Sequence, residues 1–457
     1  MQKFEELRNK YKEFIYKSYN ISEDESKIKI EYFFEIPDLA IFKPTIEIEK
    51  RDISFKNVDT DFVKKLVFNI GMIELISYWK SACPRKVIIE CGELNNEQIE
   101  WFKKLYYYGL GEYRYINNIE ISIDEMLEIE VKLKEEYKLD CKDFEDSTLN
   151  GTLIPIGGGK DSCVTAELLS NEKDNNLCLL IGGKEPSIKS AEIAGYKDKI
   201  IHVNRTIDKN LIELNKKGFL NGHTPFSSML AFLSYLISYL TGKKYIALSN
   251  ESSANESNVE GEKINHQYSK SFEFEQDFRE YANKYLNANV EYFSMLRPLN
   301  ELQIAMLFAR NDKYHKIFRS CNVGSKTIPW EWCGDCPKCL FVYIILSSFL
   351  YKEKLVEIFN QDLFEKENLL KTFIELCGYG ETKPFECVGT YEEVNFAISK
   401  TIQNLKKNNI ELPFLLKYYD ENYKLVNTDI DITKRYNEEN NLPKKYDDIL
   451  RKAIFND

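Results

Sequence analysis

The chain has 457 residues, which is enough for two or three domains with separate cores and excludes a protein with a single small domain. Its net charge of -11 argues against a large nucleic-acid-binding face, which would be basic, so a polyanionic ligand would need a local basic pocket. The N-terminus has no apolar signal region, and the apolar runs at 229–240 and 340–350 are shorter than the roughly 20 residues that cross a bilayer, so we expect a cytoplasmic chain without a membrane partner.

Residues 1–148 are expected to form an α+β domain. Apolar alternation predicts strands at 28–34, 46–48 and 86–91, and helical periodicity predicts helices at 61–79 and 96–110. The aromatic residues 101 and 106–108 could form a base-stacking platform, although aromatic residues at this spacing more often belong to a core. The charged segment 125–146 leads into the next domain.

A glycine-rich segment follows at residues 151–169. An apolar, strand-like run at 153–156 breaks into three glycines, and Lys160, Asp161 and Ser162 then open a helix-periodic stretch. Glycine allows a close approach of the backbone to a ligand, and the N–H groups at a helix start bind anions. A Walker A loop would need Gly at 154 and Ser or Thr at 161, and a dinucleotide fingerprint would need Gly at 162, so both are excluded. A turn alone would need only one glycine.

The stretch from Gly157 to Ser162 resembles the SGGxDS loop of the ATP pyrophosphatases, or PP-loop enzymes, with Gly in place of the leading Ser. These enzymes cleave ATP between the α- and β-phosphates to adenylate a substrate. The segments that follow alternate between strands and helices, with strands predicted at 177–181, 199–203 and 245–248 and helices at 187–195, 209–218 and 226–240. Such alternation predicts an α/β, doubly wound parallel sheet over residues 149–350, with the ligand outside the carboxyl ends of the strands.

Two polar segments come after the strand at 245–248, at residues 249–256 and 265–271. Most of their side chains are polar and cannot build a core. A long loop at the carboxyl end of a strand is usually a functional site when it is ordered, and disorder is the alternative. A further strand is predicted at 292–299 and a helix at 301–309.

Four cysteines have the spacing of a metal site. Cys333, Cys336 and Cys339 are three residues apart, and Cys321 lies twelve residues upstream. Four thiolates suit tetrahedral Zn²⁺ and leave no position open for water, so the zinc would be structural. Such a site fits a reducing compartment better than a disulfide framework does. Residues 351–457 are expected to form a helical C-terminal region that ends in a polar tail after about residue 405.

Seven sequence blocks together resemble the UDP-N-acetylmuramoyl-L-alanyl-L-glutamate epimerases of peptidoglycan synthesis. They are PIGGGKDS at 155–162, NGHTP at 221–225, SNESSANESNV at 249–259, NHQYSKSFEFE at 265–275, YFSMLRPLNEL at 292–302, WCGDCPKCLFV at 332–342 and KPFECVG at 383–389. The resemblance extends from about residue 60 to about residue 390. It implies a PP-loop core, the use of ATP with Mg²⁺, and inversion of the terminal L-glutamate of UDP-MurNAc-L-Ala-L-Glu through an acyl-adenylate, with release of AMP and pyrophosphate. The resemblance also implies a functional pairing with a muramoyl ligase that adds L-Glu.

The resemblance also implies roles for individual residues. Pyrophosphate would be held by Gly157, Gly158, Gly159, Lys160 and Ser162, and the rest of the nucleotide would contact Gly182 and Asn250. Asp161 would bind Mg²⁺, unless it is only an acid favoured by the helix dipole. The candidate proton-transfer groups are His223, His266 and Cys387, followed by Glu251 and Lys270. The candidate partners of the substrate's carboxylates or diphosphate are Arg297, Arg319 and Lys383.

Three other interpretations compete with this one. A 7-cyano-7-deazaguanine synthase-like ligase shares the phosphate loop and a four-cysteine knuckle, but it is usually shorter and does not explain the blocks at 249–259 and 383–389. A tRNA-thiolating PP-loop enzyme is disfavoured by the acidic charge. A non-catalytic nucleotide-sensing scaffold would have lost the Gly-Gly-Lys-Asp-Ser chemistry, which this chain retains.

Overall fold

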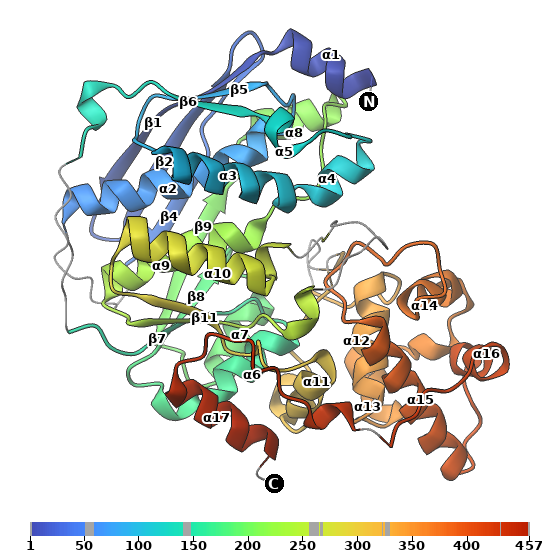
Figure 1. Cartoon of the computed structure of the whole chain (residues 1–457). Helices are drawn as coiled ribbons and strands as arrows, with labels where there is room; N and C mark the ends of the chain where they lie inside the picture. Colours follow the sequence, from blue (N-terminus) through green and yellow to red (C-terminus); the bar gives the residue numbers. More distant parts are fainter. Residues whose placement is uncertain are drawn as a thin grey trace.

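A large mixed β-sheet forms the centre of the molecule, with helices packed on it and a C-terminal group of helices beside it (Figure 1). The α/β class expected from the sequence is therefore confirmed. The computed structural model describes residues 2–50, 59–139, 148–255, 265, 268–321, 323–324, 330–429 and 431–455. None of the helices in these ranges is long and apolar enough to cross a bilayer.

The sheet has eleven strands in the order β11-β10-β7-β8-β9-β4-β2-β1-β5-β6, with β3 paired to β2. The strands of the N-terminal part are β1 (Glu13–Glu23), β2 (Lys27–Ile36), β3 (Ala40–Phe42), β4 (Thr45–Glu49), β5 (Lys86–Ile89) and β6 (Glu128–Val131). The strands that follow are β7 (Thr152–Pro155), β8 (Leu177–Ile181), β9 (Ile200–Thr206), β10 (Tyr245–Leu248) and β11 (Glu291–Ser294).

The five strands β9, β8, β7, β10 and β11 are parallel to one another. The chain enters this half of the sheet at its centre in β7, moves outward through β8 and β9, and then crosses to β10 and β11 on the other side. The direction of winding therefore reverses between β7 and β10. In an open α/β sheet, the crevice at such a switch point is where ligands bind.

Helices bury both faces of the parallel strands. Leu153 of β7 points into one hydrophobic core and the next residue, Ile154, points into a second core on the other face. Helices α9 (Phe226–Thr241) and α10 (Phe272–Tyr281) contribute to the first core, whereas α6 (Lys160–Leu168), α7 (Glu185–Ile193) and α11 (Glu301–Ala309) contribute to the second. This two-sided burial explains why the strands read as short, continuously apolar runs.

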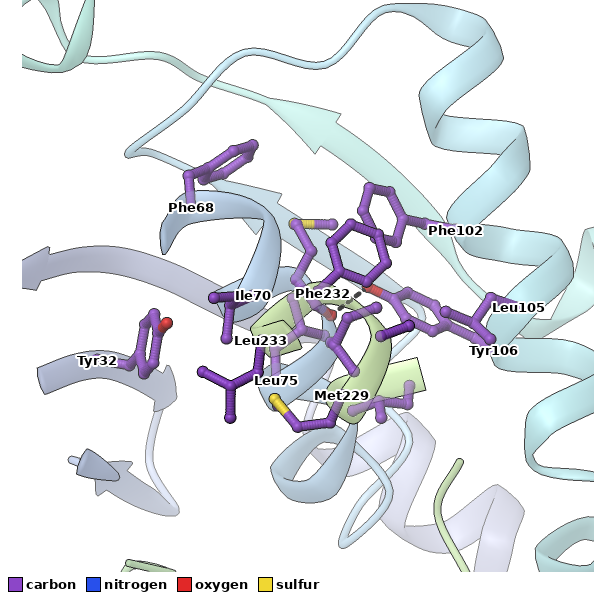
Figure 2. Packing of buried hydrophobic residues seen from close by; sticks show 14 of the residues in the cluster. Tyr32, Phe68, Ile70, Leu75, Phe102, Leu105, Tyr106, Met229, Phe232 and Leu233 are labelled. Atoms are coloured by element: carbon purple, nitrogen blue, oxygen red, sulfur yellow. Dashed lines mark hydrogen bonds between the residues drawn. The ribbon is translucent and has the colours of Figure 1, made fainter. Parts of the chain in front are cut away.

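The N-terminal strands continue the same sheet because β4 pairs antiparallel with β9. Their helices α2 (Thr60–Trp79) and α3 (Asn96–Gly109) pack against α9, and Figure 2 shows Phe102 and Tyr106 of α3 next to Phe232 of α9. The Tyr106 hydroxyl donates a hydrogen bond of 2.6 Å to the carbonyl of Met72 in α2. One sheet and one of its cores thus extend across residue 148, and the division of the chain into domains at residues 148 and 350 stays a prediction.

The remaining helices of the N-terminal and middle parts are α1 (Gln2–Lys10), α4 (Gly111–Ile116), α5 (Ile123–Met126) and α8 (Lys209–Lys216). Those of the C-terminal part are α12 (Pro337–Ser347), α13 (Lys352–Phe359), α14 (Leu370–Leu376), α15 (Tyr391–Lys407), α16 (Phe414–Asn422) and α17 (Lys444–Phe455). Helix α17 leaves the C-terminal group and returns to the sheet, where it packs near α6 (Figure 1).

The docking of α17 follows from its amphipathic sequence. Tyr446, Leu450 and Ile454 recur every four residues and form one buried face. The hydroxyl of Tyr446 lies 2.7 Å from the side-chain oxygen of Thr152, at the start of the central strand β7. The polar composition of the tail did not show whether it would be ordered. The three apolar residues of α17 give the tail a face that can be buried.

Leu450→Ala should lower the free energy of unfolding by about 2–5 kcal/mol, because the side chain is fully buried and its removal leaves a cavity between α17 and the second core. Lys452→Ala on the exposed side of the same helix is the matched control and should change it by about 0.5 kcal/mol or less. Urea unfolding of both variants measures the difference. Equal stabilities would contradict the docking of α17 in solution.

Candidate active site

A cavity of about 340 Å³ opens at the switch point between β7 and β10. We call it the switch-point cavity. The glycine loop after β7 and the polar segment after β10 form its floor, and α9, α12 and the segment around Cys387 contribute side chains to its walls. Its charged lining consists of Lys184, Lys270, Arg319 and Lys338 against Asp161 and Glu251. In a chain of net charge -11 this is a local basic site of the kind that a polyanionic ligand requires.

The glycine loop has the geometry of an anion cradle. Gly159 is the N-cap of α6 and no side chain caps this helix end, so its first N–H groups are directed toward the cavity. Gly158 has a φ of +83°, and a Cβ there would lie 2.7 Å from the backbone nitrogen of Ser187. A Cβ on Gly157 would meet no atom within 4 Å, which leaves space above the loop. The Ser162 hydroxyl accepts from Gly158 N at 3.2 Å and so braces the loop.

The side chain of Lys160 does not point into the cavity. It is completely buried, and its ammonium group donates to the carboxylates of Asp161 and Glu301. Burial by itself would lower the pKa of Lys160, but Asp161 and then Glu301 outweigh this effect and raise it. Lys160 therefore stays charged, and its contact with Glu301 ties the start of α6 to the start of α11.

Glu301 is itself part of a buried acidic pair. Its backbone N–H donates to Glu393 at 2.6 Å, and Glu393 also accepts from the Ser253 hydroxyl at 2.7 Å. Burial raises the pKa of Glu301 to about 7, while Lys160 opposes the rise. These contacts join α11, α15 and the polar segment after β10 behind the cavity floor.

Arg297 fixes the two polar segments to each other. It is fully buried, and its guanidinium donates to the carbonyl oxygens of Glu251 at 2.7 Å and Lys270 at 2.6 Å and to the carboxylate of Glu275 at 3.2 Å. Both Glu251 and Lys270 then point their side chains into the cavity. Burial, followed by the charge of Asp161, raises the pKa of Glu251 and favours its protonated form.

Cys387 faces the cavity with two lysines around it. Lys270 donates to its sulfur at 3.1 Å, and Lys338 donates to its carbonyl oxygen. Burial would lower the pKa of Lys270, but the sulfur of Cys387 and the carboxylate of Glu251 raise it, so this lysine remains a cation. An ammonium group beside a thiol favours the thiolate, the form in which cysteine acts as a base or nucleophile.

The four predicted metal-binding cysteines come together. The Cys321–Cys336, Cys333–Cys339 and Cys336–Cys339 sulfur atoms are 3.9, 3.7 and 3.4 Å apart, and all four sulfurs lie within 4.8 Å of one another. Tetrahedral zinc with bonds of about 2.3 Å places its sulfurs about 3.8 Å apart. The arrangement is therefore compatible with zinc.

This cysteine cluster lies against the switch-point cavity, to which Cys321 contributes. The two residues before Cys321 contact the glycine loop, because Arg319 N donates to Gly158 O at 2.8 Å and the Ser320 hydroxyl lies 2.8 Å from the position of a Cβ on Gly159. Lys338, between two of the cysteines, reaches the cavity from the other side. Folding of the cluster thus sets the position of one cavity wall.

Some of the other predicted site residues line the switch-point cavity and others do not. Asn250 and Arg319 line the cavity, and Asn250 donates to the Ser294 hydroxyl at 3.1 Å. Gly182, His223 and Lys383 are outside the cavity lining of the described residues; Lys383 is buried with its ammonium 5.5 Å from the centre of the Tyr391 ring. His266 lies outside the described residues.

Several residues of the site were not singled out from the sequence. Lys184 and Trp330 line the cavity together, with the ammonium 5.7 Å from the ring centre, and Lys338 sits in the middle of the predicted cysteine motif. The position of Lys338 between two of the predicted metal-binding cysteines was a usable signal. Glu301 and Glu393 carried no such signal, because each acts through a partner more than 90 residues away.

The fold and the cavity together define an α/β protein with a basic ligand site at the switch point of a parallel sheet. Comparison with known families identifies the family within this class. Residues 5–295 match the MurL N-terminal domain, and residues 317–425 match the MurL C-terminal domain. The chain belongs to the MurL family, and the resemblance carried by the seven sequence blocks is confirmed.

Individual relatives support the same family assignment. The chain is similar to proteins named UDP-N-acetyl-alpha-D-muramoyl-L-alanyl-L-glutamate epimerase. The relative from Xanthomonas oryzae pv. oryzae is 31% identical over 366 residues, which cover 78% of each chain. The relative from a Micromonospora species is 33% identical over 71% of this chain and 72% of its own, and the one from Salinispora tropica is 33% identical over 72% and 71%.

The purified protein should contain about one zinc ion per chain, and Cys336→Ser should lose the metal and lower the melting temperature, because the binding energy of a structural site contributes to folding. Cys387→Ser, in a cysteine that faces the cavity but lies outside the cluster, is the control and should keep its zinc. Metal analysis and thermal melting measure both. A metal-free protein whose melting curve matches that of the zinc-loaded protein would refute a structural zinc.

Proposed function

We propose that this protein epimerises the terminal L-glutamate of UDP-MurNAc-L-Ala-L-Glu to D-glutamate, and that it uses ATP to do so. The names of the relatives support the substrate and the reaction. The observation that carries the use of ATP is the uncapped N-terminus of α6 with its three glycines, which faces a cavity lined by four cations.

In this proposal the glycine loop acts as a PP-loop. The N–H groups of Gly157 and Gly159 hold the pyrophosphate part of ATP, and Lys270, Arg319 and Lys338 surround the phosphates. Gly158 and Ser162 keep the loop in shape through their own hydrogen bond. Lys160 acts indirectly, because its ammonium orients Asp161. Lys160, together with Lys338, lowers the pKa of Asp161 despite its burial, so Asp161 presents an ionised carboxylate that suits Mg²⁺.

Adenylation explains why an epimerase would need ATP. The Cα–H bond beside a carboxylate anion is barely acidic, since deprotonation adds a second negative charge next to the first. Attack of the α-carboxylate of glutamate on the α-phosphorus of ATP forms an acyl-adenylate and releases pyrophosphate; the carboxyl group itself no longer carries a negative charge, and the remaining charge lies on the phosphate. A side-chain base then removes the Cα proton to give an enolate, an acid returns a proton to the opposite face, and water cleaves the anhydride into the D-product and AMP.

The cavity offers a base and an acid for the two proton transfers. Cys387, paired with the Lys270 ammonium at 3.1 Å, is placed to act as the base. The raised pKa of Glu251, on the cavity floor, suits the acid. His223 is the other candidate among the described residues, and it lies three residues before Phe226, which lines the cavity. His266 remains a candidate from the sequence.

Asp161→Asn should abolish the formation of AMP from ATP and substrate, because the amide removes the anionic ligand of Mg²⁺. The fold should persist, since Glu301 still pairs with Lys160. Asp198→Asn, at an exposed site away from the cavity, is the matched control and should keep normal turnover. AMP release and circular dichroism are the measurements. Normal AMP release by Asp161→Asn would leave Asp161 as a residue of the helix start only.

In D₂O the D-glutamate product should carry deuterium at Cα, and this exchange should require ATP, because only the adenylated glutamate is acidic enough. Cys387→Ser should still form pyrophosphate while losing most of the inversion, since a hydroxyl beside Lys270 is a far weaker base than a thiolate. Mass spectrometry and pyrophosphate release distinguish the two steps. Deuterium incorporation without ATP would refute the adenylate, and full inversion by Cys387→Ser would exclude Cys387 as the base.

A further inference from the structure

A second cavity, of about 750 Å³, lies on the N-terminal part of the molecule beside α4. We call it the α4 cavity. Its lining combines the aromatic rings of Tyr107 and Tyr115, the guanidinium of Arg114, and the carboxylates of Glu120 and Glu125. Its volume falls within the range of about 300–1,000 Å³ that is usual for small-molecule sites.

Arg114 is stacked on an aromatic ring in this cavity. The centre of its guanidinium lies 3.7 Å from the centroid of the Tyr107 ring, and the Tyr107 hydroxyl is in turn anchored to the carbonyl of Ile121 at 3.2 Å. A guanidinium held by its face is pre-organised, and the N–H groups around its edge match the two oxygens of a phosphate. The stack thus holds a phosphate-binding group in one orientation.

The remaining lining suits the rest of a nucleotide. Tyr115 and Ile116 are 42% and 49% exposed, so a flat apolar surface faces the solvent beside Arg114. Aromatic rings bind any nucleobase by stacking. Carboxylates such as Glu120 accept hydrogen bonds from ribose hydroxyls, as acidic residues do in dinucleotide sites. Aromatic ring, arginine and carboxylate together match a nucleoside diphosphate.

Two segments of chain connect the α4 cavity to the switch-point cavity. Phe385 packs on Tyr115 with ring centroids 5.3 Å apart, and Cys387, two residues later, lines the switch-point cavity. On the other side, Asn117 donates to the carbonyl of Asn221 at 3.0 Å, and the chain then runs through His223 to Phe226 on the cavity wall. A ligand long enough to occupy both cavities would pass these two segments.

The substrate in the proposed function is such a ligand. Its two amino-acid residues alone span about 7 Å when extended, and the lactyl group and the sugar lie beyond them, so the diphosphate must bind outside the cavity in which glutamate reacts. Phe385 and Cys387 are two residues apart in a bent segment, so their Cα atoms lie less than about 7 Å from each other. The switch-point cavity of about 340 Å³ would in addition contain ATP.

Building on the proposed function, we propose that the α4 cavity binds the pyrimidine nucleoside diphosphate end of the substrate, with Arg114 on the diphosphate and Tyr115 under the base. This arrangement makes the cavity the specificity site for the nucleotide carrier. It also places the segment from Asn221 to Phe226 along the path of the sugar and peptide between the two cavities.

The experiment measures binding of UDP alone to the full-length protein by calorimetry. Wild-type protein should bind UDP, and saturating ATP should leave the affinity for UDP unchanged because the two nucleotides occupy different cavities. Arg114→Ala and Tyr115→Ala should each weaken UDP binding by about tenfold or more. Tyr115 is exposed, so its variant is the one that tests the site with little effect on folding. Arg85→Ala is the matched control, because Arg85 is an exposed arginine of the N-terminal part that lies outside the α4 cavity lining.

Activity measurements on the same variants separate this inference from the proposed function. Arg114→Ala should raise the KM for UDP-MurNAc-L-Ala-L-Glu while leaving the turnover of MurNAc-L-Ala-L-Glu, which lacks the nucleotide, unchanged. Unaltered UDP binding by both variants, or epimerisation by a wild-type protein that binds no UDP, would overturn the α4 site and leave the function standing. UDP binding that depends on Arg114 and Tyr115 in a protein without epimerase activity would keep the site and overturn the function.

Discussion

The arrangement of the candidate active site depends on one buried ion pair, between Lys160 at the start of α6 and Glu301 at the start of α11. A lysine inside a protein remains charged only when carboxylates compensate for its lost hydration, and here Asp161 and Glu301 do so. Glu301 in turn is held through Glu393, which caps α15. The glycine loop, the polar segment after β10 and the C-terminal helices are therefore joined by one network of charges, and each part is positioned relative to the others.

The same network explains how a strongly acidic chain maintains a basic cavity. The cations that line the cavity belong to different elements. The backbone carbonyl of Lys270 accepts a hydrogen bond from Arg297, and Lys338 lies between two cysteines of the four-cysteine cluster. A site assembled in this way is pre-organised, so its charges need little rearrangement when an anion enters. The cost is desolvation, which appears as the raised pKa values of Glu251 and Glu301.

The sequence predicted those elements that depend on residues close to one another in the chain. The bounds of β8, β10 and α11 agree with the apolar runs and caps that predict them, and the cysteine spacing predicted a cluster that forms. Strand β1 was not predicted because a register shift between Tyr16 and Ser18 interrupts its alternation, and β6 was not predicted because it is a four-residue edge strand within a charged segment. The predicted strand at 292–299 ends at Ser294 and continues as turns, one of which places Arg297. Contacts such as Lys160–Glu301 cannot be derived from one sequence, since nothing near either residue identifies its partner.

The return of the chain to β7 has a consequence for synthesis on the ribosome. Tyr446 meets Thr152 across 294 residues of sequence, so the central strand of the parallel half of the sheet gains this contact only after all of the intervening chain has been made. Domains usually fold as they emerge, N-terminal first. In this protein the strands and the glycine loop leave the ribosome long before α17, the helix that packs on their second core. The nascent chain therefore holds that core partly uncovered until α17 has been made. A product that stops before α17 would carry an exposed apolar surface that chaperones and proteases can recognise.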